Sequence, residues 1–241
     1  MPTDRLYLKD SYLKECEAII ENISDNKVIL DKTIIHPHAS GLVSDQGVII
    51  YNNEELNIID AIDDRENDNV IHILDKKPTF NVNEKVKIVI NWNRRYKLMR
   101  MHTASHIIAA LAYKKFNAMI TGGEITEEYA RDDYNINLSG DALKNAFNDI
   151  IKEANNIAKK AIEVKIYNMK KEEALKIEGI VKLLEREPPK SEIWRIVEIP
   201  GVDIQADGGP HVNNTSEIGD IELVKIENKG KDKKRVYFKV I

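Results

Sequence analysis

The sequence predicts an α+β protein that begins with a small antiparallel β-barrel. Two observations support this prediction. Short runs rich in Val and Ile, separated by Asn, Asp and Gly, fill roughly the first 90 residues, and helical patterns mixed with strands follow from Trp92. Six runs of strand length at this spacing are typical of a small barrel. We therefore expect a barrel domain over residues 1–92 and an α+β domain over residues 93–241.

The individual elements follow from the same patterns. Residues 94–116 contain no Gly or Pro and place apolar side chains at helical spacing, which predicts a helix. A second long helix is expected from about Gly140, with Ser139 as its cap. The barrel strands are expected at 12–23, 27–35, 47–51, 56–62, 69–74 and 85–91, and the later strands at 117–126, 129–138, 163–169, 193–199, 221–228 and 235–241, with a helical stretch at 170–176 and a break at Pro188 and Pro189.

Composition narrows the classes of function. The chain has 36 Lys and Arg against 40 Asp and Glu, so no overall positive field attracts nucleic acid, and any RNA contact must be local. No apolar segment approaches the roughly 18 residues needed to span a bilayer, and the N-terminus has no signal-peptide core. We expect a cytoplasmic protein with neither DNA nor a membrane as partner. The single cysteine, Cys16, excludes an internal disulfide and a metal site with two thiolates.

The segment HTASH places His102 and His106 four residues apart on the first expected helix. This spacing puts both imidazoles on one helix face, within reach of a single ion. The pair alone is a weak indication, because partly buried histidines with satisfied hydrogen bonds are common. It is also not the zinc-protease motif, which needs a glutamate where this chain has Thr103.

The later segment DGGPH offers two more ligands at the same separation. Asp207 and His211 flank a Gly-Gly-Pro turn, where glycines with positive φ would fold both side chains toward one point. Zinc accepts imidazole nitrogen and carboxylate oxygen. Asp207 would either ligate the ion or orient a ligating histidine. The alternative is a glycine-rich surface turn with an incidental histidine.

Together these segments resemble a known family. HTASH, preceded by RRYKLMR and followed about a hundred residues later by DIQADGGPHVNNTSEIG, is similar to the editing domain of alanyl-tRNA synthetase and to the free-standing AlaX-type editing proteins. The threonyl-tRNA synthetase editing domain shares the histidine pair more distantly. In the family, H-x-x-x-H and C-x-x-x-H motifs bind zinc in a hydrolytic site. The resemblance therefore implies one zinc ion, with His102, His106, Asp207 and His211 as its ligands and catalytic residues.

The chain departs from the family pattern at two places. Asp207 replaces the family cysteine, and loss of a thiolate should weaken zinc retention while leaving the ion more electrophilic. Residues 35–42, IHPHASGL, replace a stretch that resembles F-Y-P-x-G-G-G-Q, and of its three central glycines only Gly41 remains. That stretch borders the amino-acid pocket in the family, so this departure bears on substrate choice. We expect His36 and His38 at the surface, with polar contacts near the site as the alternative.

The resemblance implies a zinc-dependent deacylase that removes the wrong amino acid from tRNA(Ala), with seryl-tRNA(Ala) as main substrate and glycyl-tRNA(Ala) as a second one. We expect Thr33, Gly41 and Thr103 to bind substrate, although Thr33 is equally well explained as a strand residue. RNA contacts are expected from Arg94, Arg95, Lys97 and Arg100, whereas a second basic cluster at Lys229, Lys231, Lys233, Lys234 and Arg235 is more typical of a solvated turn. A deacylase for another mischarged tRNA and a tRNA-binding module with a decayed site are the alternatives.

Overall fold

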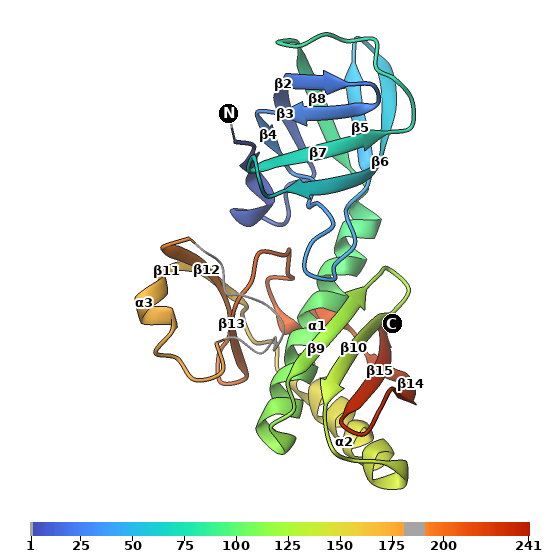
Figure 1. Ribbon diagram of the computed structural model, residues 1–241, viewed down its shortest axis with the longest axis vertical. Coiled ribbons are helices and arrows are strands. Elements are labelled where there is room, and N and C mark those ends of the chain that lie inside the picture. Colours follow the sequence, from blue (N-terminus) through green and yellow to red (C-terminus); the bar gives the residue numbers. More distant parts are fainter. Residues whose placement is uncertain (1, 181–190) are drawn as a thin grey trace. The chain divides into compact units, whose positions relative to one another are not determined.

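The computed structural model describes residues 2–180 and 191–241, and the chain divides into two compact units, Met1–Lys97 and Leu98–Ile241 (Figure 1). The first unit contains a closed barrel, and the second contains helices and two separate sheets. The boundary between the units falls within helix α1 (Trp92–Phe116). The predicted α+β fold class with an N-terminal barrel is therefore confirmed.

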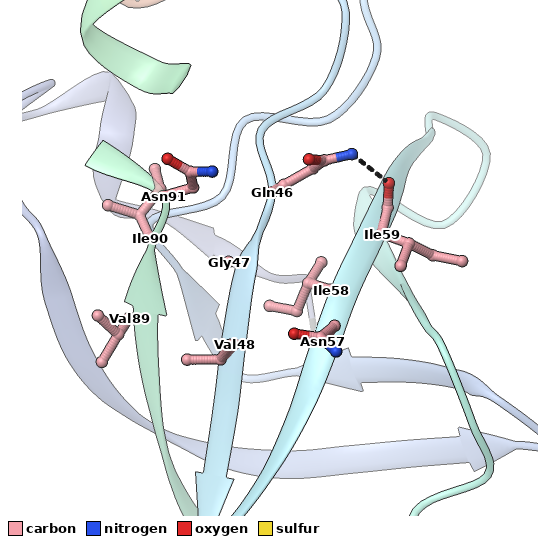
Figure 2. A pocket seen from close by; sticks show the side chains of 9 residues that line it. All are labelled: Gln46, Gly47, Val48, Asn57, Ile58, Ile59, Val89, Ile90 and Asn91. Carbon is pink, nitrogen blue, oxygen red and sulfur yellow. Dashed lines mark hydrogen bonds between the residues drawn. The ribbon is translucent and has the colours of Figure 1, made fainter. Parts of the chain in front are cut away.

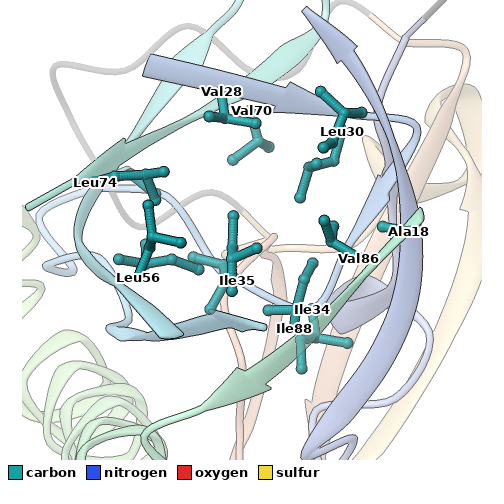
Figure 3. Packing of buried hydrophobic residues seen from close by; sticks show 14 of the residues in the cluster. Ala18, Val28, Leu30, Ile34, Ile35, Leu56, Val70, Leu74, Val86 and Ile88 are labelled. Carbon is teal, nitrogen blue, oxygen red and sulfur yellow. The ribbon is translucent and has the colours of Figure 1, made fainter. Parts of the chain in front are cut away.

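Six antiparallel strands close the barrel in the order β2-β3-β7-β6-β5-β8. Side chains along each strand alternate between a buried inner face and a more exposed outer face, as the two-residue repeat of a strand requires. The inner side chains form one apolar core, and Figure 3 shows Leu30, Leu56 and Val86 among them. The strands are β2 (Glu15–Ser24), β3 (Lys27–Leu30), β5 (Gly47–Tyr51), β6 (Glu54–Asp64), β7 (Asn69–Leu74) and β8 (Lys85–Ile90).

The run expected as one strand over residues 27–35 divides at Asp31. The Asp31 carboxylate accepts a hydrogen bond from the backbone N–H of Ile19 at 2.7 Å, and its own N–H donates to the Ile19 oxygen. The chain continues as β4 (Lys32–Thr33), which pairs in parallel with β1 (Asp4–Arg5) outside the barrel. Strand β1 and the 3₁₀ helix η1 (Leu6–Leu8) were not predicted, because both are too short to show a repeat.

Arg95 is fully buried, which corrects the prediction that it contacts RNA. Its Nε lies 3.0 Å from the carboxylate of Asp45. Its Nη1 donates to the backbone oxygen of Ser11 at 2.8 Å, and its Nη2 donates to the backbone oxygen of Ile34 at 2.6 Å and to Asp45. Because acceptors inside the first unit satisfy the guanidinium, this side chain is not available to a phosphate.

A hollow of about 410 Å³ lies along β5, β6 and β8 of the barrel (Figure 2). Gly47 lets β5 pack closely against β8, because a Cβ there would lie 2.4 Å from the Val89 oxygen, and the amide of Gln46 donates to the backbone oxygen of Ile59 at 3.2 Å. None of the residues predicted to form the site lines this hollow. Its lining consists of Gln46, Gly47, Val48, Asn57, Ile58, Ile59, Val89, Ile90 and Asn91.

The second unit holds α1 between two antiparallel sheets. Ser105 of α1 donates to Asp132 in the larger sheet, and His106 bonds to Asp203 in the smaller one. Because both sides of the helix are covered, every residue from Met101 to Ala112 is buried, whereas the sequence suggested an apolar stripe. The larger sheet has the strand order β14-β15-β10-β9 and consists of β9 (Ile120–Ile125), β10 (Ala130–Asn135), β14 (Ile221–Asn228) and β15 (Lys233–Val240). The smaller sheet has the strand order β11-β12-β13 and consists of β11 (Lys165–Lys170), β12 (Ile193–Ile199) and β13 (Asp203–Ala206).

Helix α2 (Gly140–Ala158) packs against the larger sheet. Ser139 occupies the predicted cap position, but its side chain makes no capping hydrogen bond. The Asn155 side chain attaches the helix to β14 by donating to the Ile221 oxygen at 2.8 Å and accepting from the Ile221 N–H at 2.7 Å. Phe147 adds a ring contact with Tyr134 of β10.

The remaining elements agree with the sequence except at β13 and the 3₁₀ helix η2 (Thr215–Ile218), neither of which was predicted. The short helix α3 (Lys171–Ala174) falls within the expected helical stretch, and η2 precedes β14. The break expected at Pro188 and Pro189 lies outside the described residues. Among the helices in the described ranges, none has the length and apolarity needed to cross a membrane.

Candidate metal centre

The structure brings His102, His106, Asp207 and His211 together within the second unit. Each residue offers one potential ligand atom, and these atoms lie within 4.8 Å of one another. The Asp207 carboxylate is the common neighbour. Its Oδ2 lies 3.6 Å from Nε2 of His102 and 3.9 Å from Nε2 of His106. Its Oδ1 lies 3.3 Å from Nε2 of His211.

Hydrogen bonds at Nδ1 determine the tautomers of His102 and His106. Nδ1 of His102 lies 3.3 Å from the backbone oxygen of Pro210, and Nδ1 of His106 lies 3.0 Å from Oδ2 of Asp203. Carbonyl and carboxylate oxygens only accept, so each Nδ1 carries the proton. The Gln205 amide nitrogen also lies 3.4 Å from Nδ1 of His106, but it donates to Asp203 at the shorter distance of 2.9 Å. The Nε2 atom of each neutral ring therefore has a free lone pair, and both of these atoms lie near Asp207.

Thr103 determines the tautomer of His211 in the same way. Its Oγ1 lies 2.9 Å from the backbone oxygen of Met99, which can only accept, so the hydroxyl donates its single proton there. The same Oγ1 lies 3.0 Å from Nδ1 of His211 and therefore accepts a proton from that ring. His211 is thus also left with an Nε2 lone pair near Asp207. The predicted substrate contact at Thr103 is, in this structure, a support for a candidate ligand.

The resulting donor set fits one zinc ion. Three imidazole lone pairs and a carboxylate face each other. These electron-rich atoms repel one another unless a cation or a shared proton lies between them. Zinc binds imidazole nitrogen and carboxylate oxygen at about 2.0–2.2 Å, so tetrahedral ligands lie about 3.3–3.5 Å apart. The measured separations of Asp207 from the three histidines, 3.3 to 3.9 Å, approach that spacing.

The electrostatics favour the protonation states that a cation needs. Burial lowers the pKa of His102 to about 4 and lowers the pKa of His211 well below its ordinary value. Burial alone would raise the pKa of Asp207, but the surrounding histidines hold it well below its ordinary value. At neutral pH both imidazoles are therefore neutral and the carboxylate is charged, so a metal does not have to displace protons from these groups.

Close packing, and not unusual backbone geometry, explains Gly209 in the DGGPH loop. We expected positive φ at the glycines, but neither Gly208 nor Gly209 adopts it, which corrects that prediction. A Cβ at Gly209 would lie 2.5 Å from Cε1 of His102, so only glycine leaves room for the ring. The Gly209 N–H donates to Oδ1 of Asp207 at 2.6 Å, and Arg195 donates to the backbone oxygens of both residues.

Sequence reasoning missed Asp203, whose side chain is completely buried beside His106. The available signal was the alternation in DIQAD, because residues 203, 205 and 207 share one side of an extended chain. Asp203 also lines a cavity of about 300 Å³ between α1 and the β12–β13 hairpin. None of the residues predicted for the site lines this cavity.

Comparison with known proteins identifies the family. Residues 194–237 match the family model described as the threonyl and alanyl tRNA synthetase second additional domain. The chain is 54% identical over 238 residues to the alanyl-tRNA editing protein AlaX-M of Saccharolobus solfataricus, covering 99% of both chains. The chain belongs to the AlaX-M family. It is also 35% identical to AlaX-M of Methanosarcina barkeri, over 99% of both chains, and 36% identical to the alanine–tRNA ligase of Saccharolobus islandicus, over 94% of this chain and 25% of the ligase.

In this AlaX-M chain, Thr33 lies inside the barrel unit and is fully buried. Nδ1 of His72 lies 3.1 Å from the Val28 oxygen and must carry the proton, so Nε2 accepts from the Thr33 hydroxyl at 2.8 Å. The backbone N–H of Ile35 donates to the same hydroxyl at 3.0 Å. The proton of Thr33 is thus already used, which argues against the expected contact with a substrate hydroxyl.

The altered stretch around Gly41 forms a tight turn. Ala39 and Leu42 exchange two backbone hydrogen bonds, with Ser40 and Gly41 between them at φ values of 60° and 84°. Gly41 is thus explained by its backbone conformation, and its contact with substrate stays a prediction. His38 is exposed as expected, but His36 is buried against the ring of Tyr7, so the surface prediction is wrong for His36.

The other basic residues divide into exposed and engaged side chains. Lys97 is exposed, and Arg94 is half-buried with its Nε donating to the Ser44 oxygen at 3.1 Å. Arg100 donates to the backbone oxygens of Ile218 and Ile241. The second cluster lies on the β14–β15 hairpin, where Lys234 is buried and donates to the Gly230 and Lys231 oxygens, and Arg235 pairs with Asp133.

Proposed function

We propose that this protein is a zinc-dependent deacylase, which hydrolyses the ester between a wrong amino acid and the terminal ribose of tRNA(Ala). The observation that supports this most is the set of three oriented imidazoles around the Asp207 carboxylate, in a member of a family whose curated relatives are named alanyl-tRNA editing proteins. An ester of this kind is already activated. Hydrolysis therefore needs chiefly a positioned water and stabilisation of developing negative charge.

Zinc would be held by His102, His106 and His211, with Asp207 as the fourth ligand or as a neighbour of the ion. When bound, zinc supplies Lewis-acid chemistry, which polarises a carbonyl and lowers the pKa of water. The chain's own contribution is orientation. Nδ1–H bonds hold all three rings with Nε2 near Asp207, and burial keeps His102 and His211 neutral.

Asp207 has one of two roles, which variants separate. Its Oδ1 already accepts from the Gly209 N–H, while its Oδ2 faces His102 and His106. If Asp207 ligates zinc, Asp207→Ala loses zinc and deacylation together. If it instead orients a ligating histidine, Asp207→Ala keeps zinc, measured by metal analysis, and lowers deacylation by about 10 to 100-fold. Full zinc and full activity in that variant would show that Asp207 only shapes the turn.

We propose seryl-tRNA(Ala) as the main substrate and glycyl-tRNA(Ala) as a second one. A site built for alanine cannot strongly exclude either amino acid, because one small group contributes only about 1–3 kcal/mol of discrimination in an apolar pocket. A second site that hydrogen-bonds the serine hydroxyl rejects alanine, since its polar groups are then left unpaired. Gly41 remains a predicted substrate contact, and Thr103 enters the proposal as the support of His211.

For the RNA we propose local contacts at Lys97 and Arg94. The net charge of −4 gives no general attraction to a polyanion, so individual cations must carry phosphate binding. Lys97 is exposed at the N-terminal part of α1. Each phosphate contact that is removed should reduce the salt dependence of tRNA binding by about one unit of slope.

A panel of mischarged tRNAs tests the proposal against its alternatives. Zinc-loaded protein should release serine from tRNA(Ala) faster than alanine, and a chelated sample should release neither. Faster hydrolysis of a different mischarged tRNA would favour the alternative that the altered stretch at residues 35–42 suggests. A purified protein that binds tRNA but neither binds zinc nor hydrolyses any ester would favour the binding module.

A further inference from the structure

We propose that Asp203 is the positioning residue for His106, fixing its tautomer and strengthening Nε2 as a metal donor; this rests on the proposed zinc site. Its carboxylate Oδ2 lies 3.0 Å from Nδ1 of His106, and its side chain is completely buried. Neither the motif pair nor the names of the relatives mark this residue.

The geometry of β13 explains how Asp203 reaches α1. The strand alternates between buried and partly exposed residues, with Asp203 and Gln205 on the buried side. The Gln205 amide donates to Oδ2 of Asp203 at 2.9 Å, the same oxygen that accepts from His106. Two donors at one oxygen hold the carboxylate in place. Asp207 follows at the next position of the same alternation, so one short segment supplies both a candidate ligand and the support of another.

The partner of His106 differs from those of the other two histidines. His102 donates to a backbone carbonyl and His211 donates to a hydroxyl, and both acceptors are neutral. Hydrogen bonds to a carboxylate are roughly twice as strong as neutral ones. A carboxylate behind a ligating imidazole fixes the ring and makes the metal-facing nitrogen more basic. His106 should therefore be the strongest nitrogen donor of the three.

Charge balance supports the same role. Removing a carboxylate from water costs several kcal/mol unless other groups compensate. His106 and Gln205 each donate a hydrogen bond to Asp203. A divalent cation on the far side of His106 would balance the two carboxylates, Asp203 and Asp207.

Zinc affinity of the metal-stripped full-length protein, measured by competition with a chromophoric chelator, tests this inference without using activity. Asp203→Ala removes the acceptor and should weaken zinc binding by about 10 to 100-fold. Asp203→Asn keeps an acceptor oxygen without the charge and should lose less than the alanine variant. Asp132→Asn is the matched control, because Asp132 is a buried carboxylate bonded to Ser105 and Tyr134 but to no candidate ligand. Its zinc affinity should stay within about twofold of the unaltered protein.

If Asp203 had a purely structural role, substituting it would leave the tautomer of His106 unchanged. Nitrogen-15 NMR of the metal-free protein should show Nδ1 of His106 protonated in the unaltered chain and in Asp203→Asn, and a mixture of tautomers in Asp203→Ala. Unchanged zinc affinity in a folded Asp203→Ala variant would overturn the inference. If that variant does not fold, unchanged affinity in Asp203→Asn would overturn it. Deacylation measured on the same samples tests the proposed function separately. Zinc binding without hydrolysis would contradict the proposed function but not the role of Asp203.

Discussion

Oγ1 of Thr103 lies 3.0 Å from Nδ1 of His211, and because this hydroxyl donates to the Met99 oxygen, it accepts from the histidine. Thr103→Val removes the acceptor with little change of shape and takes it from two buried N–H groups, those of the His211 ring and the Val212 backbone. We expect zinc affinity to fall by about 10-fold or more. Stability of the metal-free protein should fall by about 1–3 kcal/mol. Chelator competition and chemical denaturation measure the two effects. Thr103→Ser keeps the hydroxyl and is the control; equal zinc affinity in all three proteins would contradict the assigned tautomer.

Much of the fold and of the site could be predicted because the relevant residues lie in regular patterns. The barrel strands repeat every two residues, and His102 and His106 are neighbours on a helix whatever it packs against. The approach of Asp207 and His211 to this pair followed from the resemblance, since no local rule brings together segments about a hundred residues apart.

Other features depend on tertiary packing and could not be read from the sequence. Arg95 stands among exposed-looking cations in RRYKLMR, and only its pairing with Asp45 distinguishes it from Lys97. Asp203 looked like a loop residue because β13 is four residues long. Gly209 suggested an unusual φ, whereas the actual constraint is the ring of His102, more than a hundred residues earlier.

Gly209→Ala should displace His102. The added Cβ would lie 2.5 Å from Cε1 and 2.8 Å from Nδ1 of that ring, so either the ring or the loop must move. We expect weaker zinc binding and slower deacylation, measured together by metal analysis and ester hydrolysis. Gly122→Ala in β9 is the control, because a Cβ added there would lie at an ordinary 3.8 Å from Oδ2 of Asp133. Normal zinc content in Gly209→Ala would show that the loop is free to adjust.

The buried His72 should make folding stability depend on pH. Burial lowers its pKa to about 4 from an ordinary 6.5, so between these values the unfolded chain binds more protons than the folded one. Stability contributed by neutral His72 is present above pH 6.5 and is lost as the pH falls toward 4. The loss should be about 2 kcal/mol at pH 5.

Urea denaturation of the metal-free protein at about pH 7.5 and pH 5 measures this effect. The His72→Gln variant has no titrating group at this position. The free energy of unfolding should therefore fall between pH 7.5 and pH 5 by about 2 kcal/mol less in this variant than in the unaltered protein. Other buried histidines are common to both proteins and cancel in the comparison. An identical pH response would show that His72 is protonated as easily in the folded barrel as in the unfolded chain.

Substitution of Arg95 should lower stability, whereas substitution of Lys97 should weaken RNA binding. Arg95→Met leaves the buried Asp45 carboxylate unpaired and should destabilise the protein by about 3–5 kcal/mol. Lys97→Ala should leave stability unchanged, weaken tRNA binding and lower its salt slope by about one. Thermal denaturation and tRNA binding at several salt concentrations measure both properties. A stable Arg95→Met protein with impaired tRNA binding would restore the original prediction for Arg95.

The most direct measurement is the rate of seryl-tRNA(Ala) hydrolysis by zinc-loaded protein, with alanyl-tRNA(Ala) in parallel and a chelated sample as control. The three oriented imidazoles and Asp207 predict rapid loss of serine that depends on zinc and spares alanine. Hydrolysis that continues at full rate after complete removal of zinc, or no hydrolysis of any mischarged tRNA(Ala) by the zinc-loaded protein, would contradict the account.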